Sequence, residues 1–433
     1  MSNRSILTAV VFAIALIPTT ATAQTATNTW IATASGNWSI AGNWDANGVP
    51  ASASTTVVQF NGGSGAAYTA TQDIAAGFLL NGLINNNTAG PTVTSATGDS
   101  LTFVANGGTG PFIYQNSSGS FTIGASGNAA YTIAGNLTLG GGGTGIIGLA
   151  NPLIFQGSAI TLAGFNTTSN GGGAALPSSA FTVNGNGVSS LNFSGILSGT
   201  PTSFTINTTA ANYDTGAVFL SGANTFTASG GVILQSGNLS ITNAAGLGNA
   251  NNVLKISGGT LRVSATVPNP IVMNNTDLLY PGASTGTLTG PITVTGTAGL
   301  QVLGTGGLTL DNTAGFNGAT TVGVPGITTS TMTIGSTAST TGSLLNTNGI
   351  TVSTGSNSGT SGNLVLTNAT ASAQRLSAST PITLNSGRLT YISSATGVNA
   401  YSFGNLTVNG FGGISTQNAG TDTSPTALTI NAL

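Results

Sequence analysis

Few side chains in this chain could carry out acid–base, nucleophilic or metal chemistry. The sequence contains no His, no Cys and no Glu, so its titratable groups are seven Asp, five basic residues and seven Tyr. A general acid or base needs a pKa near the working pH, and a Ser or Thr nucleophile needs a basic partner. We therefore predict no catalytic, no cofactor-binding and no metal-binding residue. The Asp residues are Asp45, Asp73, Asp99, Asp214, Asp277, Asp311 and Asp422.

Folding could still bring scattered carboxylates together, which keeps an enzyme open as an alternative. A polysaccharide lyase or hydrolase built on a β-helix would need two or more Asp converging with Arg375, Arg388 or Lys255 in one groove. Only Lys255 and Asp277 are separated by the interval at which a sequence repeat recurs, and that interval would set them on adjacent coils. A surface ion pair is the simpler interpretation of these two residues.

The elements that would position these groups repeat along the chain. The repeated pattern is an apolar–any–apolar triplet, a Gly turn and a second triplet that begins with Leu, and its copies are residues 232–241, 254–263 and 382–391. The segment 218–232 also aligns without a gap with 308–322, and this alignment matches Phe226 with Phe316. The first two copies recur after about 22 residues, which is typical of a repeat protein, so one elongated domain is expected.

Triplets with apolar ends and a polar centre, most often Thr, predict short strands with the apolar ends inward and Thr outward. Leu137-Thr-Leu139 and Phe204-Thr-Ile206 are examples. Asn-Gly steps could instead mark antiparallel hairpins, but the recurrence of the repeat favours one coil per copy. The predicted fold is all-β: a single-stranded right-handed parallel β-helix, or β-solenoid. It would have about 18 coils, a length on the order of 90 Å, and Thr and Asn ladders on its outside.

Three regions follow one another along the chain. Residues 1–23 read as a signal peptide, because Arg4 precedes an apolar run and Ala21-Thr-Ala23 provides a cleavage site. Residues 24–60 are expected to form an N-terminal cap, since Trp30, Trp38 and Trp44 are the only Trp in the chain. An exposed aromatic patch for sugars is the alternative. Residues 61–433 are the β-helix repeat region, and no later segment is apolar enough to span a membrane.

The amino-acid composition limits the classes of partner that the protein can bind. Charged residues make up 3 % of the chain, and only five of these are Lys or Arg, so nucleic acid is excluded as a partner. Hydrophobic residues make up 39 %, which is enough for a core. The surface must then consist of uncharged polar residues and will associate readily with copies of itself.

The segment from Leu220 to Leu261 resembles the autotransporter-associated β-strand repeat of passenger regions, and Gly36–Trp44 with Gly48-Val-Pro50 is similar to the start of such passengers. The resemblance implies a secreted or surface-exposed right-handed β-helix that usually lacks enzymatic activity. The sequence shows no C-terminal translocator barrel, which would need some ten or more amphipathic strands. The chain is then either a fragment or a member that is released or retained by a separate translocator or anchor.

These observations predict a noncatalytic secreted or cell-surface β-solenoid that mediates adhesion or self-association. Its expected partners are copies of itself or glycans of the cell surface or extracellular matrix. One alternative is the carbohydrate-active enzyme described above. Another is a module that binds a surface, a glycan or ice through outward Thr arrays such as Thr293-Val-Thr295 and Thr331-Met-Thr333. The irregular spacing of the triplets argues against arrays that stay in register over several coils.

Overall fold

The computed structural model describes most of the chain as short strands that wind around one long core. The described residues are 28–61, 66–125, 127–164, 166–186, 189–209, 217–274, 277–279, 284–297, 299–312, 314–324, 330–336, 341–353, 362–368, 374–393, 399–418 and 426–430. The signal peptide predicted at residues 1–23 and its cleavage site lie outside these residues. One short 3-10 helix, η1 (Ala41–Asn43), is the only helix among the described residues.

Each turn of the chain passes three sides of the core, which we name face 1, face 2 and face 3 in the order in which the chain meets them. Face 1 carries a 12-stranded sheet and, further along, a two-stranded sheet. The strands of the larger sheet are β1 (Asn28–Trp30), β3 (Val57–Phe60), β6 (Gly82–Asn85), β9 (Phe112–Gln115), β12 (Leu137–Gly141), β15 (Ala159–Gly164), β18 (Phe181–Gly185), β21 (Phe204–Thr208), β23 (Val232–Ser236), β25 (Leu254–Ile256), β28 (Ile271–Met273) and β31 (Ile292–Val294); those of the smaller sheet are β40 (Asn399–Phe403) and β43 (Thr426–Ile430).

Face 2 carries the longest sheet, which has 16 strands. They are β2 (Gly36–Asn37), β4 (Thr69–Gln72), β7 (Thr92–Ser95), β10 (Phe121–Ile123), β13 (Ile147–Leu149), β16 (Thr167–Asn170), β19 (Ser190–Phe193), β22 (Ala217–Leu220), β24 (Asn238–Ile241), β26 (Thr260–Val263), β29 (Asp277–Leu279), β32 (Leu300–Val302), β34 (Ala319–Val322), β36 (Gly349–Ser353), β38 (Ile382–Asn385) and β41 (Leu406–Asn409).

Face 3 carries two sheets in succession. The first consists of β5 (Phe78–Leu80), β8 (Leu101–Phe103), β11 (Tyr131–Ile133), β14 (Leu153–Phe155), β17 (Ala174–Leu176) and β20 (Leu197–Gly199). The second consists of β27 (Thr266–Val267), β30 (Gly286–Leu288), β33 (Gly307–Leu310), β35 (Thr331–Ile334), β37 (Asn363–Thr367), β39 (Arg388–Ser393) and β42 (Gly413–Asn418).

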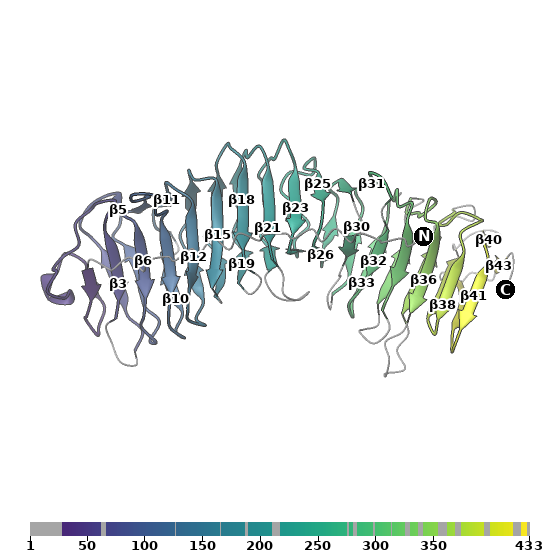
Figure 1. The fold of residues 1–433 in the computed structure, drawn as a ribbon, viewed down its shortest axis with the longest axis horizontal. Helices are drawn as coiled ribbons and strands as arrows, with labels where there is room; N and C mark the ends of the chain where they lie inside the picture. The colour runs from purple at the N-terminus through teal and green to yellow at the C-terminus, as the bar shows by residue number, and fades with distance from the viewer. Residues whose placement is uncertain are drawn as a thin grey trace, which may run out of the picture.

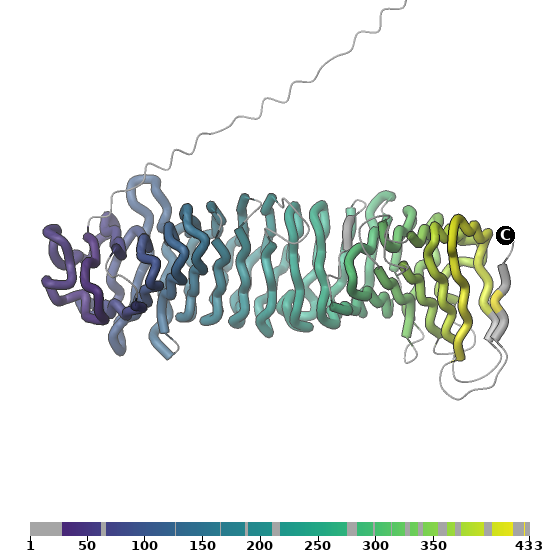
Figure 2. The backbone as a smooth tube through the Cα atoms, turned by 90° about the horizontal axis from the view of Figure 1, so that it is seen from below, coloured from purple at the N-terminus to yellow at the C-terminus, as the bar shows by residue number. Residues whose placement is uncertain are grey.

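Strands that neighbour each other on a face run parallel, and they form an elongated, gently curved solenoid (Figures 1 and 2). The prediction of an all-β fold built as a parallel β-solenoid is therefore confirmed. The Asn-Gly step at Asn184-Gly185 makes no hairpin: it ends β18, which pairs in parallel with β15 and β21. At Asn106-Gly107, by contrast, Asn106 and Thr109 form an antiparallel bridge across a tight turn.

The alternation of side chains is also as predicted. Leu137 and Leu139 are buried in the core, whereas Thr138 between them is only partly buried on the outside. The predicted Asn ladders are present as well. Exposed amide groups of Asn61, Asn86 and Asn116 donate and accept from one turn to the next at 2.9 and 3.0 Å.

The expected coil length of about 22 residues is found in some turns of the solenoid and not in others. Leu254 pairs with Val232, at the interval of the repeat, but its partner on the other side is Ile271, which is nearer in the sequence. Ile350 pairs with Ile382, which is farther away than one repeat. The corner loops differ in length while the strands keep their pairing, so the chain makes fewer turns than the sequence predicted.

The third copy of the repeat occupies a different place in the turn from the first. Residues 232–241 form β23 on face 1 and β24 on face 2, whereas residues 382–391 form β38 on face 2 and part of β39 on face 3. Phe226 and Phe316 are likewise both fully buried, but one lies between β22 and β23 and the other between β33 and β34. The repeat specifies a strand, a corner and a strand, and each side of the solenoid can accept that unit.

Candidate functional site

The described Asp residues are spread along the solenoid, and two of them accept hydrogen bonds near its N-terminal end. Asp73 accepts from the backbone N and the Oγ of Ser39, at 2.8 and 2.7 Å, near the N-terminal end. Asp45 accepts from the backbone N of Asn47 at 3.1 Å within a turn. Asp214 and Asp422 lie outside the described residues, and of Asp277 only the strand is described. No group of three or more possible metal-ligating side chains occurs in the part of the chain that the structure describes.

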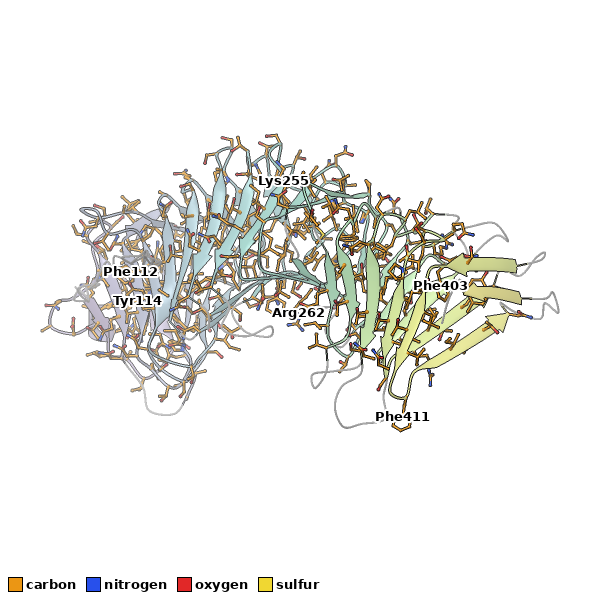
Figure 3. The ribbon with its side chains drawn as sticks, turned by 45° about the vertical axis from the view of Figure 1, so that its right-hand side comes forward. Phe112, Tyr114, Lys255, Arg262, Phe403 and Phe411 are labelled. Carbon is orange, nitrogen blue, oxygen red and sulfur yellow. The ribbon has the colours of Figure 1, made fainter. Side chains whose placement is uncertain are left out.

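Lys255 and Asp277 lie in adjacent coils, as the repeat interval predicts, but on different faces. Lys255 belongs to β25 on face 1, where its partner in the next turn is Val272. Asp277 begins β29 on face 2 and pairs with Leu300. The turn after β25 is shorter than the repeat, so Asp277 has already passed to the next face. Figure 3 shows the exposed Lys255 side chain well apart from Arg262, the other basic residue of this region.

Arg375 is a charged residue whose side chain is almost completely buried, with 1 % of its surface exposed. It lies between β37 on face 3 and β38 on face 2, in a part of the solenoid where the described residues form no strand on face 1. The donor atoms of its guanidinium group bind oxygen atoms that line this part of the core. They are the backbone carbonyls of Thr367 (2.7 Å), Gly342 (3.0 Å), Ser336 (3.4 Å) and Thr341, and the side-chain oxygen of Asn368 (3.2 Å).

Two Tyr side chains complete this cluster. The Oη of Tyr401 accepts from the backbone N of Arg375 at 3.0 Å and from that of Leu376. The Oη of Tyr391 accepts from Nδ2 of Asn368 at 3.1 Å, and the two Tyr rings lie 5.2 Å apart. We name Arg375, Asn368, Tyr391 and Tyr401 the arginine cluster.

The electrostatics of the arginine cluster suit a structural role. Burial lowers the pKa of Arg375, an effect opposed by the nearby Asp311 and by both Tyr, and burial raises the pKa values of Tyr391 and Tyr401. Asp311 accepts from Oγ of Ser336 at 3.2 Å. Of the described Asp residues, it is the one whose charge acts on Arg375. Among the described residues, a single Asp therefore lies near Arg375, whereas the enzyme alternative requires two or more. The guanidinium group is also buried and not accessible to a substrate.

From the sequence, Arg375 was one of three basic residues that could line a catalytic groove. Nothing in the sequence indicated that its side chain would be buried. Its partners come from four separate segments as far as 39 residues away, so only the stacking of turns shows the cluster. The structure shows why Gly occupies position 335: its φ is 80°, and a Cβ at this position would overlap the guanidinium group.

The predicted alternative of an exposed aromatic patch at the N-terminal end is wrong. Trp30 and Trp38 are fully buried and Trp44 is 3 % exposed. The rings of Trp38 and Trp44 meet edge to face at 5.6 Å, and Nε1 of Trp44 donates to the carbonyl of Trp38 at 2.6 Å. These rings fill the core at this end and offer no face to a sugar.

Outward Thr residues form two ordered rows on the surface of the solenoid. On face 2, each residue pairs with the next in the series Thr321, Thr351, Thr383 and Thr407, which we name the face 2 rank. On face 3 the same holds for Thr266, Thr287, Thr309 and Thr333, the face 3 rank. Neighbouring strands lie about 4.8 Å apart, so each rank presents hydroxyl and methyl groups at that interval.

These ranks overturn the expectation that irregular spacing prevents register. Thr321, Thr351 and Thr383 are unevenly spaced in the sequence and farther apart than one repeat, yet each pairs directly with the next, because the extra residues lie in loops between the strands. The Thr residues that the sequence predicted to form outward arrays differ in their strand partners. Thr333 belongs to the face 3 rank, whereas Thr331 pairs with Gly307 and Asn363, and Thr293 pairs with Val272.

Comparison with known proteins found no match of this chain to a protein-family model, to a curated protein or to a solved structure. Among the described residues, no helix is long and apolar enough to span a membrane. The function must therefore be argued from the surfaces of the solenoid itself.

Proposed function

We propose that this protein is a noncatalytic, secreted or cell-surface β-solenoid that adheres to extracellular glycans or to copies of itself. The face 2 and face 3 ranks are the observation that carries this proposal. They supply a regular, uncharged surface along the C-terminal half of the rod. The resemblance to autotransporter passengers and the signal peptide expected at residues 1–23 favour an extracellular location.

The chemistry of a Thr rank matches a polymer that is extended, uncharged and rich in hydroxyl groups. Each Thr donates and accepts one hydroxyl hydrogen bond and adds a methyl contact. Thr is restricted about χ1, and its backbone is fixed by pairing on both sides, so little side-chain entropy is lost on binding. Weak contacts repeated at a constant interval add up through multivalency.

The described carboxylates support the noncatalytic part of the proposal. Asp73 and Asp45 hold turns near the N-terminal end, and Asp311 lies beside a buried Arg whose donors bind backbone carbonyls. A glycosidase needs two carboxyl groups on opposite sides of one sugar bond. Incubation of the protein with the glycans that it binds should therefore release no new reducing ends and no unsaturated sugar.

Binding to insoluble and soluble polysaccharides tests the adhesive role. The double variant Thr309→Lys/Thr333→Lys should lose most binding if the face 3 rank is the contact, because it puts two long charged side chains in the middle of the rank. The matched control is Thr182→Lys/Thr205→Lys, a directly paired Thr couple on face 1. An equal loss in both variants, or in neither, would argue against the face 3 rank, and the same design with Thr351 and Thr383 tests face 2.

A second candidate, recognition of an ordered surface such as ice, is favoured by the fact that each rank keeps register over four turns. Thermal hysteresis and inhibition of ice recrystallisation distinguish it from glycan adhesion. If ice is the ligand, Thr309→Lys/Thr333→Lys should abolish hysteresis while the wild type binds no glycan. If glycans are the ligand, the wild type shows no hysteresis.

A further inference from the structure

Tyr114 differs from the other described Tyr residues in its surroundings. The other four are buried, and the Oη of each accepts a hydrogen bond from within the chain; they are Tyr68, Tyr131, Tyr391 and Tyr401. Tyr114 belongs to β9, its side chain is only partly buried, and its Oη has no hydrogen-bond partner among the described residues. A Tyr hydroxyl can both donate and accept, so this one is available to a ligand.

The ring of Tyr114 is held by a small apolar cluster on the outer side of face 1, separate from the main core. Its centroid lies 4.6 Å from that of the Phe112 ring, and the two planes meet at 31° (Figure 3). Phe112 in turn covers Gly82 of the previous turn, where an added Cβ would overlap its ring. Val57 and Ile84 complete the cluster and are buried. The Tyr114 ring is therefore a fixed and partly exposed apolar surface.

Two exposed amide groups lie next to this ring. Asn116 follows Tyr114 by two residues, and Gln115 between them is fully buried, so Tyr114 and Asn116 face the same side. The backbone N of Asn116 donates to the carbonyl of Asn85 at 2.8 Å, so the chain stays paired here. Positions two apart in an extended chain are separated by roughly 7 Å. Nδ2 of Asn116 donates to Oδ1 of Asn86 at 3.0 Å, which places a second exposed amide beside the first.

Hydrogen bonds along the Asn ladder fix both amides. Oδ1 of Asn116 accepts from the backbone N of Gly142 at 3.1 Å, and Nδ2 of Asn86 donates to Oδ1 of Asn61 at 2.9 Å. An Asn amide has two N–H donors and two acceptor lone pairs, so one of each on Asn86 and on Asn116 is not used by these bonds. Because the side chains are already ordered, a ligand that uses the remaining groups costs little side-chain entropy.

The strands around this ring and these amides carry no charge. The strands of face 1 from β1 to β23 contain no Lys, Arg or Asp, and the next strand, β25, contains Lys255. An anionic ligand therefore meets no cation in these strands. An aromatic ring beside amide groups instead suits a ligand that has an apolar face and hydroxyl groups at its edge. A neutral sugar has this chemistry.

We propose that Tyr114, Asn86 and Asn116 bind one residue of a neutral glycan, and we name these three residues the Tyr114 site. The sugar ring stacks on Tyr114, its hydroxyl groups bind the two amides, and Oη of Tyr114 supplies a further hydrogen bond. The face 2 and face 3 ranks hold a polymer through many similar contacts, whereas the Tyr114 site holds a short oligosaccharide at one place. This inference rests on the glycan adhesion of the proposed function and adds a separate surface to it.

Calorimetric titration with neutral hexasaccharides of glucose, mannose and N-acetylglucosamine tests the site. At least one of the three should bind saturably to the wild type. Tyr114→Ala should weaken that binding by about tenfold or more, because the stacking surface is lost. Tyr114→Phe keeps the ring and should weaken it by about three- to tenfold through the loss of one hydrogen bond, and Asn116→Ala should have a similar effect.

Two matched variants control for the loss of an outward ring and for the loss of a ladder amide. Phe219→Ala removes a partly buried outward aromatic side chain from β22 on face 2. Asn207→Ala removes an exposed amide whose Nδ2 donates to Oδ1 of Asn184 at 3.2 Å, and the residue two positions before it is Thr205 instead of an aromatic. Both variants should bind the hexasaccharide as tightly as the wild type does.

Three outcomes overturn the Tyr114 site. They are a wild type that binds none of the three hexasaccharides, binding that resists both Tyr114→Ala and Asn116→Ala, and an equal loss in the matched controls. Preferential binding of a hexamer of galacturonate would also overturn it, because the site has no cation for a carboxylate. Circular dichroism of each variant confirms that it is folded, and Tyr114→Phe keeps the apolar cluster intact.

The oligosaccharide and polysaccharide assays separate this site from the ranks. Thr309→Lys/Thr333→Lys should lose adhesion to polysaccharide and still bind the hexasaccharide. Tyr114→Ala should lose the hexasaccharide and keep most of the adhesion to polysaccharide. Failure of the ranks alone therefore leaves the Tyr114 site standing, and failure of the Tyr114 site alone leaves the ranks standing.

Discussion

The guanidinium group of Arg375 lies against the α-carbon of Gly335, so close that no side chain fits between them. Gly335 directly follows β35 on face 3, and Arg375 follows β37, which is the strand of face 3 one turn later. The buried Arg donates hydrogen bonds to carbonyl groups of neighbouring turns, in a part of face 1 where the described residues form no strand.

The contact predicts that Gly335→Ala destabilises the fold through both its backbone and its neighbour. An Ala at φ of 80° is strained in any surroundings, and its methyl group would displace the guanidinium group. Gly98→Ala is the matched control, because Gly98 has φ of 88° but nothing within 4 Å of an added Cβ. Urea denaturation followed by circular dichroism should show Gly335→Ala to be less stable than Gly98→Ala by about 1 kcal/mol or more. Equal midpoints would mean that the arginine cluster adjusts freely.

Replacement of Arg375 by Met should destabilise the protein strongly. Met keeps a long side chain but leaves the carbonyls of Thr367 and Gly342 without these donors, and each orphaned buried carbonyl costs about 1–3 kcal/mol. Arg388→Met is the control, since Arg388 is exposed on β39 and its loss should cost no more than about 0.5 kcal/mol. A similar urea midpoint for both variants would contradict a structural role for Arg375.

The stability of the protein should fall in alkali. Burial raises the pKa of Tyr68 and that of Tyr131 to about 12, although hydrogen bonds from Asn87 and Ser95 oppose the shift. In the unfolded chain these groups ionise near pH 10, so unfolding releases protons between about pH 10 and 12. The free energy of unfolding is thus unaffected by them below pH 10 and decreases as the pH rises towards 12.

The double variant Tyr68→Phe/Tyr131→Phe tests this origin of the alkaline loss. Between pH 10 and 12 its free energy of unfolding should decline less steeply than that of the wild type, by on the order of 2 kcal/mol per Tyr over the interval. Parallel curves for the two proteins would assign the alkaline loss to other groups. Urea titrations at pH 8, 10 and 11.5 provide the comparison.

Trp fluorescence should report on one end of the solenoid. All three Trp of the chain are buried there within residues 30–44, whereas far-UV circular dichroism averages over every turn. Stacked repeats unfold partly independently of one another. If the turns that contain β38 to β42 unfold first, the circular dichroism signal should begin to fall at a lower urea concentration than the fluorescence changes. Coincident transitions would instead indicate that the whole solenoid unfolds in one step.

The matched variants Trp38→Ala and Phe403→Ala each open a large cavity, one at either end of the core. Both should lose about 3–5 kcal/mol locally. Only Trp38→Ala should shift the fluorescence transition of the remaining Trp by the full amount. A full shift with Phe403→Ala would show tight coupling between the ends.

The sequence determined the local structure because the alternation of side chains is a property of a single short strand. In Leu137-Thr-Leu139 only the two ends are apolar, so the strand position and the inward direction of its side chains follow from the residues themselves. The recurrence of the repeat likewise predicted the correct partners in β23 and β25, since that turn contains no inserted loop.

Only the tertiary structure decided which residues from different turns meet. Corner loops vary in length without changing the strands, so sequence distance does not fix the face on which a strand lies. Thr351 therefore pairs with Thr321 although more than one repeat separates them, Lys255 and Asp277 lie on different faces although the repeat interval separates them, and the copy at 382–391 lies on another pair of faces. The burial of Arg375 depends on carbonyls from several turns and has no local signature. Stacking of backbone hydrogen bonds sets this register, and those bonds are the same for every residue type.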